Sequence, residues 1–386
     1  MDATALDDIR VIDFTRVLSG PYCTLQLAEL GADVIKVEHP KGGDSTRSFT
    51  VSNVEGQSTY FMQINHSKRS VVLDLSSEEG RKNAFELARF ADVVVENFRP
   101  GVMKRLGLDY ESLSAGSESL IYASISGYGS SGEFARRPGY DPVIQAESGL
   151  MAMTGEPDGQ PMRTGMSLVD AVTGMFTAQS ILAALVQRGR TGRGQHVEVS
   201  LFGSGVNMLV NFAGAHLMTG ESPGRPGNGN LVAQPSNLYQ AADGPLVLTC
   251  VGDDAFRRLC EEVLDAPEMA SDSKFATNGA RLANGAELDQ RLNELLGKAP
   301  RAYWIERLHA AGIPAGEVRD VAQALSSEEF HSLDLISRVQ HPVAGETPVL
   351  RAPMKLHGAA RATARPAPLL GEHTEEILAE LREPEG

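Results

Sequence analysis

The chain has 386 residues, 42% hydrophobic and 22% charged, which exceeds the usual size of one hydrophobic core, so we expect a globular enzyme with two domains. Its formal net charge of -15 argues against a nucleic-acid-binding protein, which needs a clustered basic surface. The three cysteines form no CxxC pair, no run has membrane-span length and no signal-peptide pattern is present, so we expect a cytoplasmic protein without disulfides, zinc or a membrane anchor.

Strands and helices alternate along the first part of the chain. Nearly continuous apolar runs predict buried strands, and the segments between them predict helices. The predicted strands cover 9–15, 33–38, 70–75, 92–96 and 120–126, and the first two helices cover 21–30 and 77–90. This alternation predicts an α/β domain with a parallel sheet. The turn from Thr15 to Pro21 is not a G-x-G-x-x-G fingerprint, so we expect no NAD site of the usual kind.

A long helix begins near Asp170. Its apolar residues recur at helical spacing, at Met175, Phe176, Ile181, Leu182, Leu185 and Val186. Asp170 would then lie at or near the N-cap, where backbone N–H groups and the helix dipole keep a carboxylate ionised well below neutral pH. An aspartate at a helix start is by itself typical of a cap, so its chemistry has to be judged with the rest of the chain.

A glycine- and proline-rich stretch divides the chain. Before it we expect an apolar helix over 201–218. After it, two strands around Asp243-Gly244 and several helices predict a small domain, and strand-like sequence returns after residue 333. We therefore place a large α/β domain at 1–218, a linker at 219–237, a small α+β domain at 238–332 and a C-terminal return at 333–386.

Motifs spread over nearly the whole chain match one family in order. They are 11–15 with 19–21, 31–38, Gly43-Asp44 with Arg47, Asn65 with 68–70, 95–98 with Pro100-Gly101, 126–129, 139–141, 191–194 and 369–373. The ordered set resembles the family III CoA-transferases, which include formyl-CoA transferase, carnitine CoA-transferase and the α-methylacyl-CoA racemases. Within this pattern Asp170 falls on the family's catalytic aspartate.

The resemblance implies a fold and a set of partners. A Rossmann-like large domain would be completed by the returning segment, and two chains would form an interlocked homodimer. Coenzyme A would enter as part of the substrate, with no permanently bound cofactor. The nine histidines have no metal-ligand spacing, so we expect no metal. The expected partners are an acyl-CoA, a small carboxylic acid and a second copy of the chain, without nucleic acid or membrane.

The resemblance also implies covalent catalysis by Asp170. Its carboxylate would attack the donor thioester to give a mixed anhydride and then an aspartyl-CoA thioester, and the acceptor acid would reverse these steps. Leu18 and Tyr140 are expected to line the active site. Arg47 and Arg16 are expected to line it as well, because they follow strand ends, where α/β sheets bind ligands, and Arg47 is the first and Arg16 the second candidate for binding the second carboxylate of a dicarboxylic acceptor. Asn97, Phe98 and Arg105 are expected to contact the CoA nucleotide, with His39 and Lys104 as further candidates, the alternative for Lys104 being a solvated surface position.

Departures from the family's members bear on the substrates. Leu18 replaces the glutamine of formyl-CoA transferase, and Gly224 to Asn230, either a lid or a linker, stands where that enzyme has a run of glycines. These departures argue against formyl-CoA and oxalate as the substrate pair. The turn at 16–21 and the segment 139–141 resemble the dicarboxylate branch more closely, with succinyl-CoA as donor and a C4–C6 acid as acceptor. The alternative is a racemase acting by α-proton exchange. Tyr140 argues against it, because a tyrosine replaces the racemases' histidine and is a poor base at neutral pH.

Overall fold

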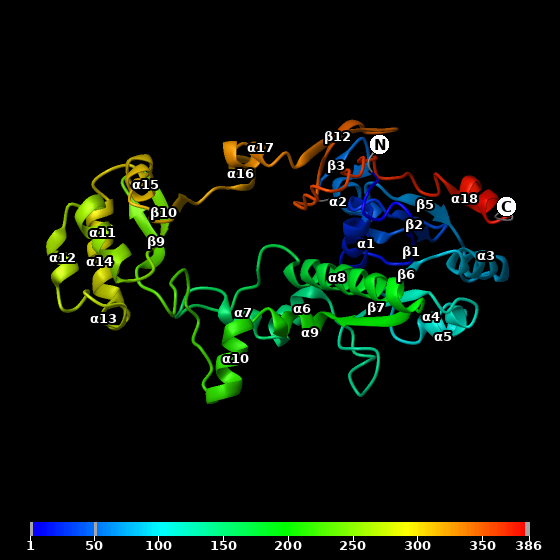
Figure 1. Cartoon of the computed structure of the whole chain (residues 1–386), viewed down its shortest axis with the longest axis horizontal. Helices are drawn as coiled ribbons and strands as arrows, with labels where there is room; N and C mark the ends of the chain where they lie inside the picture. Colours follow the sequence, from blue (N-terminus) through cyan, green and yellow to red (C-terminus); the bar gives the residue numbers. More distant parts are fainter. Residues whose placement is uncertain (1–2, 50–51, 383–386) are drawn as a thin grey trace. The chain divides into compact units, whose positions relative to one another are not determined.

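The computed structural model describes residues 3–49 and 52–382. The chain divides into two compact units, each described here by itself (Figure 1). The described residues of the first unit fall within Met1–Leu150, Arg163–Gly220 and Leu333–Gly386, and those of the second within Met151–Met162 and Glu221–Ser332. The sequence placed 151–162 in the large domain and 221–237 in a linker, whereas both stretches belong to the second unit.

A six-stranded parallel sheet organises the first unit. Its strands are β1 (Arg10–Asp13), β2 (Asp33–Glu38), β5 (Arg69–Val72), β6 (Val93–Glu96), β7 (Ile121–Ser126) and β8 (Gln195–Ser200). They lie in the order β5-β2-β1-β6-β7-β8, and every neighbouring pair is parallel. The predicted parallel α/β sheet is confirmed. The strand order is that of doubly wound nucleotide-binding folds and reverses direction between β1 and β6.

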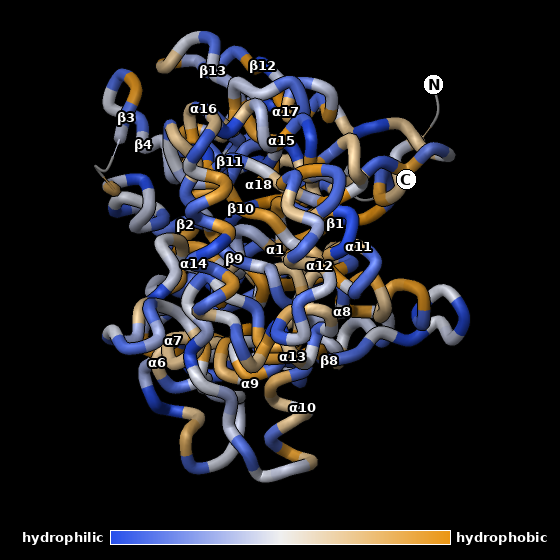
Figure 2. The backbone as a smooth tube through the Cα atoms, turned by 90° about the vertical axis from the view of Figure 1, so that its left-hand side faces the viewer, coloured by the Kyte–Doolittle hydropathy of each residue, from blue (hydrophilic) through white to orange (hydrophobic). Residues whose placement is uncertain are grey.

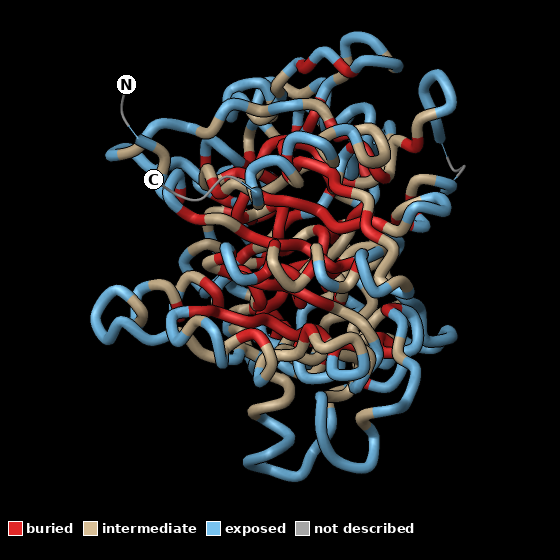
Figure 3. Tube along the Cα trace, turned by 90° about the vertical axis from the view of Figure 1, so that its right-hand side faces the viewer, coloured by how far each residue is buried: buried red, intermediate tan, exposed pale blue. Residues whose placement is uncertain are grey.

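Helices cover both faces of this sheet. Val11 of β1 packs with α1 (Ser19–Glu29) and α8 (Leu168–Thr191) on one face, and Ile12 packs on the opposite face. That second face is covered by α3 (Glu78–Arg89), α4 (Val102–Leu106), α5 (Tyr110–Ser114) and α18 (Thr374–Glu380). The strands other than the edge strand β8 are consequently buried on both sides, and Figure 3 draws the buried residues in red.

Shorter elements complete the first unit. They are η1 (Ser45–Ser48), β3 (Asn53–Val54), β4 (Gln57–Ser58), α2 (Thr59–Asn65), α6 (Asp141–Glu147), α9 (Leu201–Asn207), α10 (Val210–Thr219), β12 (Ile336–His341) and β13 (Gly345–Leu350), while α7 (Leu150–Met153) lies at the boundary of the units.

The helix predicted over 201–218 is in fact two helices. α9 and α10 are separated by Met208 and Leu209, and Val210 has a left-handed φ of 43°. A β-branched residue rarely takes this conformation, and hydrophobic periodicity does not reveal it. α10 carries several apolar residues (Figure 2), yet Leu217 and Met218 are 84% and 88% exposed.

α8 has the length and composition of a membrane-spanning helix, although no such run was recognised in the sequence. Part of its surface is buried in the first unit. Ala178 and Ile181 pack with α1 and the sheet, and Val169 packs with Ile144 of α6 and Leu201 of α9. A core helix of a globular unit has the same composition, and this packing accounts for the hydropathy of α8.

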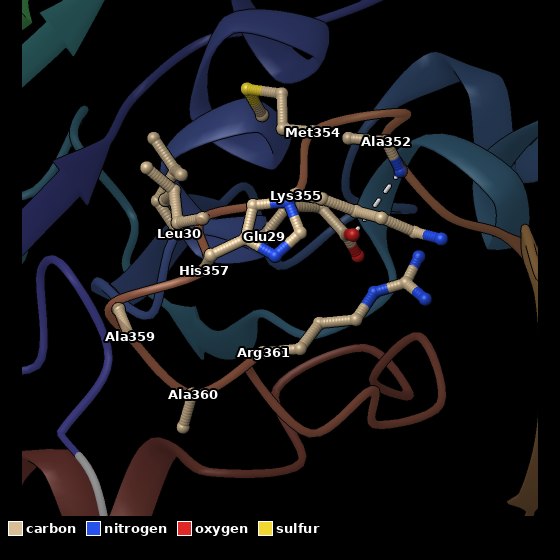
Figure 4. Close-up of a pocket in the computed structure, with 10 residues that line it drawn as sticks. Glu29, Leu30, Ala352, Met354, Lys355, His357, Ala359, Ala360 and Arg361 are labelled. Atoms are coloured by element: carbon tan, nitrogen blue, oxygen red, sulfur yellow. Dashed lines mark hydrogen bonds between the residues drawn. The ribbon is translucent and has the colours of Figure 1, made fainter.

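The segment after residue 333 packs on the first unit. β12 and β13 form an antiparallel hairpin. Next along the chain, the buried Arg351 pairs with Glu29 of α1 at 2.7 Å, and Ala352 donates its N–H to the same carboxylate. Figure 4 shows this carboxylate at the edge of a cavity of about 200 Å³ between α1 and the returning segment.

The end of the chain is tied to the edge of the sheet. Arg69 of β5 pairs with Glu376 and Glu380 of α18 at 2.9 and 2.5 Å, and Ile377 is fully buried in the core. Because these contacts join residues more than 300 positions apart, the C-terminal segment is an integral part of the first unit.

The second unit has a separate core. β9 (Ser236–Ala241), β10 (Gly244–Thr249) and β11 (Ala315–Glu317) form an antiparallel sheet, and Leu246 and Leu248 pack with Trp304. The helices are α11 (Asp253–Arg258), the π-helix η2 (Leu259–Val263), α12 (Pro267–Ser271), α13 (Asn278–Ala283), α14 (Gly285–Leu296), α15 (Arg301–Ala310), α16 (Val321–Leu325) and α17 (Glu328–Ser332).

Candidate active site

A cavity of about 350 Å³ opens at the carboxyl ends of the strands in the first unit. Ligands of doubly wound sheets bind at this edge, where the strand order reverses. The cavity is lined by the turn after β1, the loop after β6 and the loop after β7, together with the start of α8. The lining residues are Arg16–Ser19, Asn97–Pro100, Ile125–Gly127, Ala135–Tyr140, Asp170 and Leu201.

Backbone contacts fix the turn after β1. Asn97 accepts the N–H of Arg16 at 2.9 Å and donates to its carbonyl at 2.8 Å. Val17 has a φ of 69°, which is unfavourable for a β-branched residue, and the surrounding contacts hold it there. A Cβ atom on Gly20 would come within 2.3 Å of the Thr15 side chain, so the close turn requires glycine.

Two buried lysine–aspartate pairs lie next to this turn. Lys68 Nζ lies 3.1 Å from Asp13, and Lys36 Nζ lies 3.0 Å from Asp44 and donates to the carbonyl of Thr15. Burial alone would raise the pKa of Asp13, but the two ammonium groups hold that pKa below its ordinary value. The four charges therefore compensate one another. These two ion pairs, called here the ionic layer, hold the backbone of the turn in place.

Asp170 lies on the cavity wall as the third residue of α8, after the N-cap Ser167. A Cβ atom on Gly174 would come within 2.6 Å of the Ser19 carbonyl, so this glycine brings α8 close to the start of α1. Burial and the charge of Asp141 raise the pKa of Asp170 to about 7, against a hydrogen bond with Ser19 that lowers it. The prediction that Asp170 stays ionised well below neutral pH is wrong.

The reason is that another carboxylate occupies the helix end. Asp141 Oδ2 accepts the N–H groups of Val169 and Asp170 at 2.9 and 3.2 Å. Asp170 therefore receives no capping bond from the N–H groups that Asp141 takes, and it faces a neighbouring negative charge. The sequence pattern 139–141 pointed to this region but not to a cap 29 positions away from Asp170.

Tyr60 of α2 does not line the cavity but is influenced by the carboxylates of the site, and the sequence reasoning missed it. Burial and the charges of Asp170, Asp44 and Asp141 raise the pKa of its hydroxyl to about 12, which places it within the field of all three carboxylates. Tyr60 follows Thr59 at the start of a short helix in a region without a strand-end signal, so nothing local in the sequence indicates that it reaches this group.

The predicted CoA residues lie in four different places. Asn97 and Phe98 line the main cavity, and the Arg16 guanidinium lies 5.0 Å from the centre of the Phe98 ring. Arg105 lines an adjoining cavity of about 410 Å³ with Arg16, Phe98 and Arg81, the last of which was not predicted. His39 lines a small recess of about 30 Å³ beside Phe98, whereas Lys104 is exposed and outside these cavities.

Of the four predicted lining residues, Arg16, Leu18 and Tyr140 border the main cavity. Arg47 does not. Its guanidinium forms two hydrogen bonds with the buried Glu38, at 2.7 and 2.6 Å, and lies over the Phe61 ring. Arg47 also donates to the carbonyl of Pro368. Arg47 thus lies outside this cavity, and these partners already use its donors.

The carboxyl group of Glu96 is, after that of Asp170, a second group with a pKa near neutral pH. Its Oε2 accepts the N–H of Phe98 at 2.8 Å, and burial together with the charge of Glu198 raises its pKa to about 7 despite hydrogen bonds from Ser124 and Phe98. Glu96 lies behind the loop that carries Asn97 and Phe98, so its titration has to be separated from that of Asp170 in any pH profile.

Over residues 3–49 and 52–382, no group of three or more metal-ligating side chains is gathered in one place.

We expect Asp170→Asn to stabilise the protein at pH 8. The folded-state pKa of about 7 exceeds the ordinary 3.8, so the folded state binds more protons between these values and Asp170 costs stability as pH rises. The gain from the neutral amide should be about 1–3 kcal/mol at pH 8 and smaller at pH 5.5. Urea unfolding at the two pH values measures it, and a gain that does not grow with pH would contradict the raised pKa.

Comparisons with known proteins agree on one family. The family model of CoA-transferase family III matches residues 6–374. The acetyl-CoA:oxalate CoA-transferase of Acetobacter aceti is 41% identical, covering 98% of this chain and 96% of its own length. The succinyl-CoA:glutarate CoA-transferase of Mus musculus is 36% identical, covering 99% and 87%. The crystal structure of a CAIB/BAIF family protein from Brucella suis matches with a TM-score of 0.88 and 39% identity, covering 98% of this chain and all of that one.

Proposed function

The chain belongs to CoA-transferase family III and is a CoA-transferase, and on this premise we propose that it moves CoA from an acyl-CoA to a carboxylic acid through covalent intermediates on Asp170. The observation that carries the proposal is the position of Asp170 on the cavity wall, beside Ser19 at the start of α1. CoA would lie along the main cavity and the adjoining one, against Phe98, Arg16 and Arg105.

The reaction needs no net proton transfer. An oxygen of Asp170 attacks the donor's carbonyl carbon, the C–S bond breaks, and an anhydride and CoA thiolate form. The thiolate attacks the Asp170 carbonyl carbon, which releases the donor acid and leaves an aspartyl-CoA thioester. The acceptor carboxylate attacks this thioester to give a second anhydride and CoA thiolate again. The thiolate then attacks the acceptor's carbonyl carbon and frees Asp170.

The raised pKa of Asp170 suits this role. A carboxylate with a pKa of about 7 is a stronger base and nucleophile than one stabilised at a helix N-cap, and it still ionises near neutral pH. Negative charge that develops on the thioester oxygen would be stabilised by the N-terminus of α1, which no side chain within the described ranges caps.

For the substrates, we propose succinyl-CoA as donor and a dicarboxylic acid as acceptor. Relatives act on such acids, glutarate in the mouse enzyme and oxalate in the Acetobacter enzyme. The test is an acceptor screen with succinyl-CoA, acetyl-CoA and formyl-CoA as donors, with the acyl-CoA products identified by mass. Transfer to no acid from any of these donors would contradict the proposal.

Arg16 is our candidate for the acceptor's second carboxylate. It lines the cavity, and no ion pair to it occurs among the described side chains, whereas Arg47 is paired with Glu38. Losing a charge-assisted pair should cost about 2–5 kcal/mol in transition-state binding. We therefore expect Arg16→Gln to lose kcat/KM for succinate but little for butyrate, with Arg47→Gln as the control that lowers stability instead. Equal losses on both acids would assign Arg16 to CoA or to structure.

The racemase alternative is not favoured. It requires a base on each side of the substrate's α-carbon, and the residue at the relevant position is Tyr140, which is 68% exposed. Deuterium uptake into acyl-CoA from heavy water, measured without an acceptor acid, would reveal such an activity. The relatives described above are CoA-transferases.

We further propose that the enzyme works as an interlocked homodimer in the cytoplasm. The exposed apolar residues of α10 (Val210, Leu217 and Met218) offer a surface that a second copy can cover. Cys23, Cys250 and Cys260 are buried free thiols, which suits a reducing compartment. Sedimentation equilibrium of the full chain tests the dimer, and a monomer at micromolar concentration would contradict it.

A further inference from the structure

The carboxylate of Asp141 is built into the start of α8. It is 2% exposed, and its Oδ2 accepts the N–H groups of Val169 and Asp170. The first N–H groups of a helix have no partner within the helix and need an outside acceptor. The local N-cap residue, Ser167, makes no side-chain capping bond, so the cap of α8 comes from α6.

The other oxygen of Asp141 is held by Gln145, one turn further along α6. Gln145 Nε2 donates to Asp141 Oδ1 at 2.6 Å. Gln145 Oε1 accepts the N–H and the hydroxyl of Thr164 at 3.0 and 3.2 Å. Both side chains are buried. α6 thus fixes the loop before α8 at Thr164 and the helix itself at Val169 and Asp170.

We propose that Asp141 is the positioning residue of this active site, which with Gln145 fixes the backbone of Asp170 and takes the helix N–H groups that would otherwise bind the Asp170 carboxylate. The inference rests on the proposed function, in which Asp170 is the nucleophile. It assigns to Asp141 an effect on the reactivity of Asp170 in addition to its effect on folding.

Two consequences follow for Asp170. Its carboxylate is denied the helix end and keeps the Ser19 hydroxyl as donor, so it remains on the cavity wall. The ionisable group that acts on its pKa is Asp141 of α6, and the charge of Asp170 in turn raises the pKa of Tyr60 of α2. Because the charge of Asp141 raises the pKa of Asp170, removing that charge should lower the pH at which Asp170 ionises.

Asp141→Asn tests the proposal. The amide keeps the size of the side chain, but only its oxygen can accept a hydrogen bond. Its NH₂ group would face either the NH₂ group of Gln145 or the N–H groups of α8, so one of these two contacts must break. We expect kcat to fall by about 10²-fold, as for a misplaced reacting group. The KM for acyl-CoA should change by less than about threefold, since the CoA cavity is untouched. The midpoint of the pH–kcat profile should move to lower pH.

A compensating variant separates positioning from folding. In Asp141→Asn/Gln145→Glu, the new carboxylate at position 145 can accept from the new amide and from Thr164, so these two contacts are restored with the charge moved by one turn. The long bond from Gln145 to the Met166 carbonyl, at 3.4 Å, is lost. We expect it to recover at least about tenfold of the lost kcat. If Asp141→Asn does not fold, Gln145→Ala tests the same contacts with both aspartates present and should lose about tenfold in kcat.

The pH profiles are compared in a Glu96→Gln background, because Glu96 also titrates near neutral pH. There the shift caused by Asp141→Asn must persist. Wild-type kcat and an unchanged midpoint in Asp141→Asn would overturn the proposal, and so would a loss that the compensating variant does not recover. A failure of the proposed function gives a different result from a failure of this inference. If the wild type transfers CoA to no acid, or if Asp170→Ala stays active, the proposed function is wrong and the inference about Asp141 is wrong with it.

Discussion

Asp170→Ala should lose CoA transfer almost completely, with kcat falling by about 10³-fold or more, as when a covalent nucleophile is removed. The cavity, the ionic layer beneath the first turn and the cap from Asp141 to the N–H groups of Val169 and Asp170 all remain in this variant. We therefore expect CoA affinity, measured by calorimetry, to stay close to that of the wild type.

Chemical trapping connects the loss to a covalent intermediate. Hydroxylamine added during incubation with acyl-CoA should convert Asp170 to a hydroxamate, which peptide mass analysis locates. The matched control is Asp109→Ala, which removes another aspartate from a helix start, the N-cap of α5, outside the cavities described. It should transfer CoA at the wild-type rate. If Asp170→Ala keeps even a tenth of wild-type turnover, the covalent mechanism is wrong.

Patterns within one element were sufficient to predict the sheet. β2 covers the predicted residues 33–38, and β7 begins within one residue of the predicted start at 120, because buried parallel strands are nearly continuous apolar runs. The break between α9 and α10 was missed, since it depends on the left-handed conformation of Val210 rather than on composition. Sequence periodicity reports which face is buried and does not report where the backbone turns.

Contacts between residues far apart in the sequence limit how much of the site can be predicted from the sequence. The position of Asp170 near a helix start could be read from the sequence, but its protonation could not, because the cap comes from Asp141 on another helix. The strand-end argument ranked Arg47 before Arg16. Only the fold shows that Arg47 is paired with Glu38 while Arg16 lines the cavity.

Arg351→Ala should destabilise the first unit by about 3–5 kcal/mol, the cost of leaving one partner of a buried ion pair without the other. Arg351 and Glu29 are almost fully buried, and the guanidinium also donates to Ser337 and to the carbonyl of Ala362. The returning segment is joined to α1 at this point, so its loss should loosen the segment as a whole. Arg338→Ala is the matched control, because its pair with Glu346 on the same segment is solvent-exposed and should contribute little.

The single tryptophan separates the two units in this measurement. Trp304 lies in the second unit, so its fluorescence during urea unfolding reports that unit, whereas hydrogen exchange of the β1 and β5 amides reports the first. We expect Arg351→Ala to increase exchange in the first unit and to leave the fluorescence transition unchanged. Equal effects on both units, or none on the first, would contradict the role assigned to this pair.

The loss should also depend on pH, because His66 Nδ1 lies 3.7 Å from Glu29. Burial and the charge of Arg351 lower the pKa of His66 to about 4, so the imidazole is neutral in the wild type at pH 7. Without Arg351 that pKa rises, and below its new value protonated His66 can take the place of the missing cation beside Glu29. The destabilisation should therefore be smaller at pH 5.5 than at pH 8, and Arg351→Ala/His66→Ala should lose this difference.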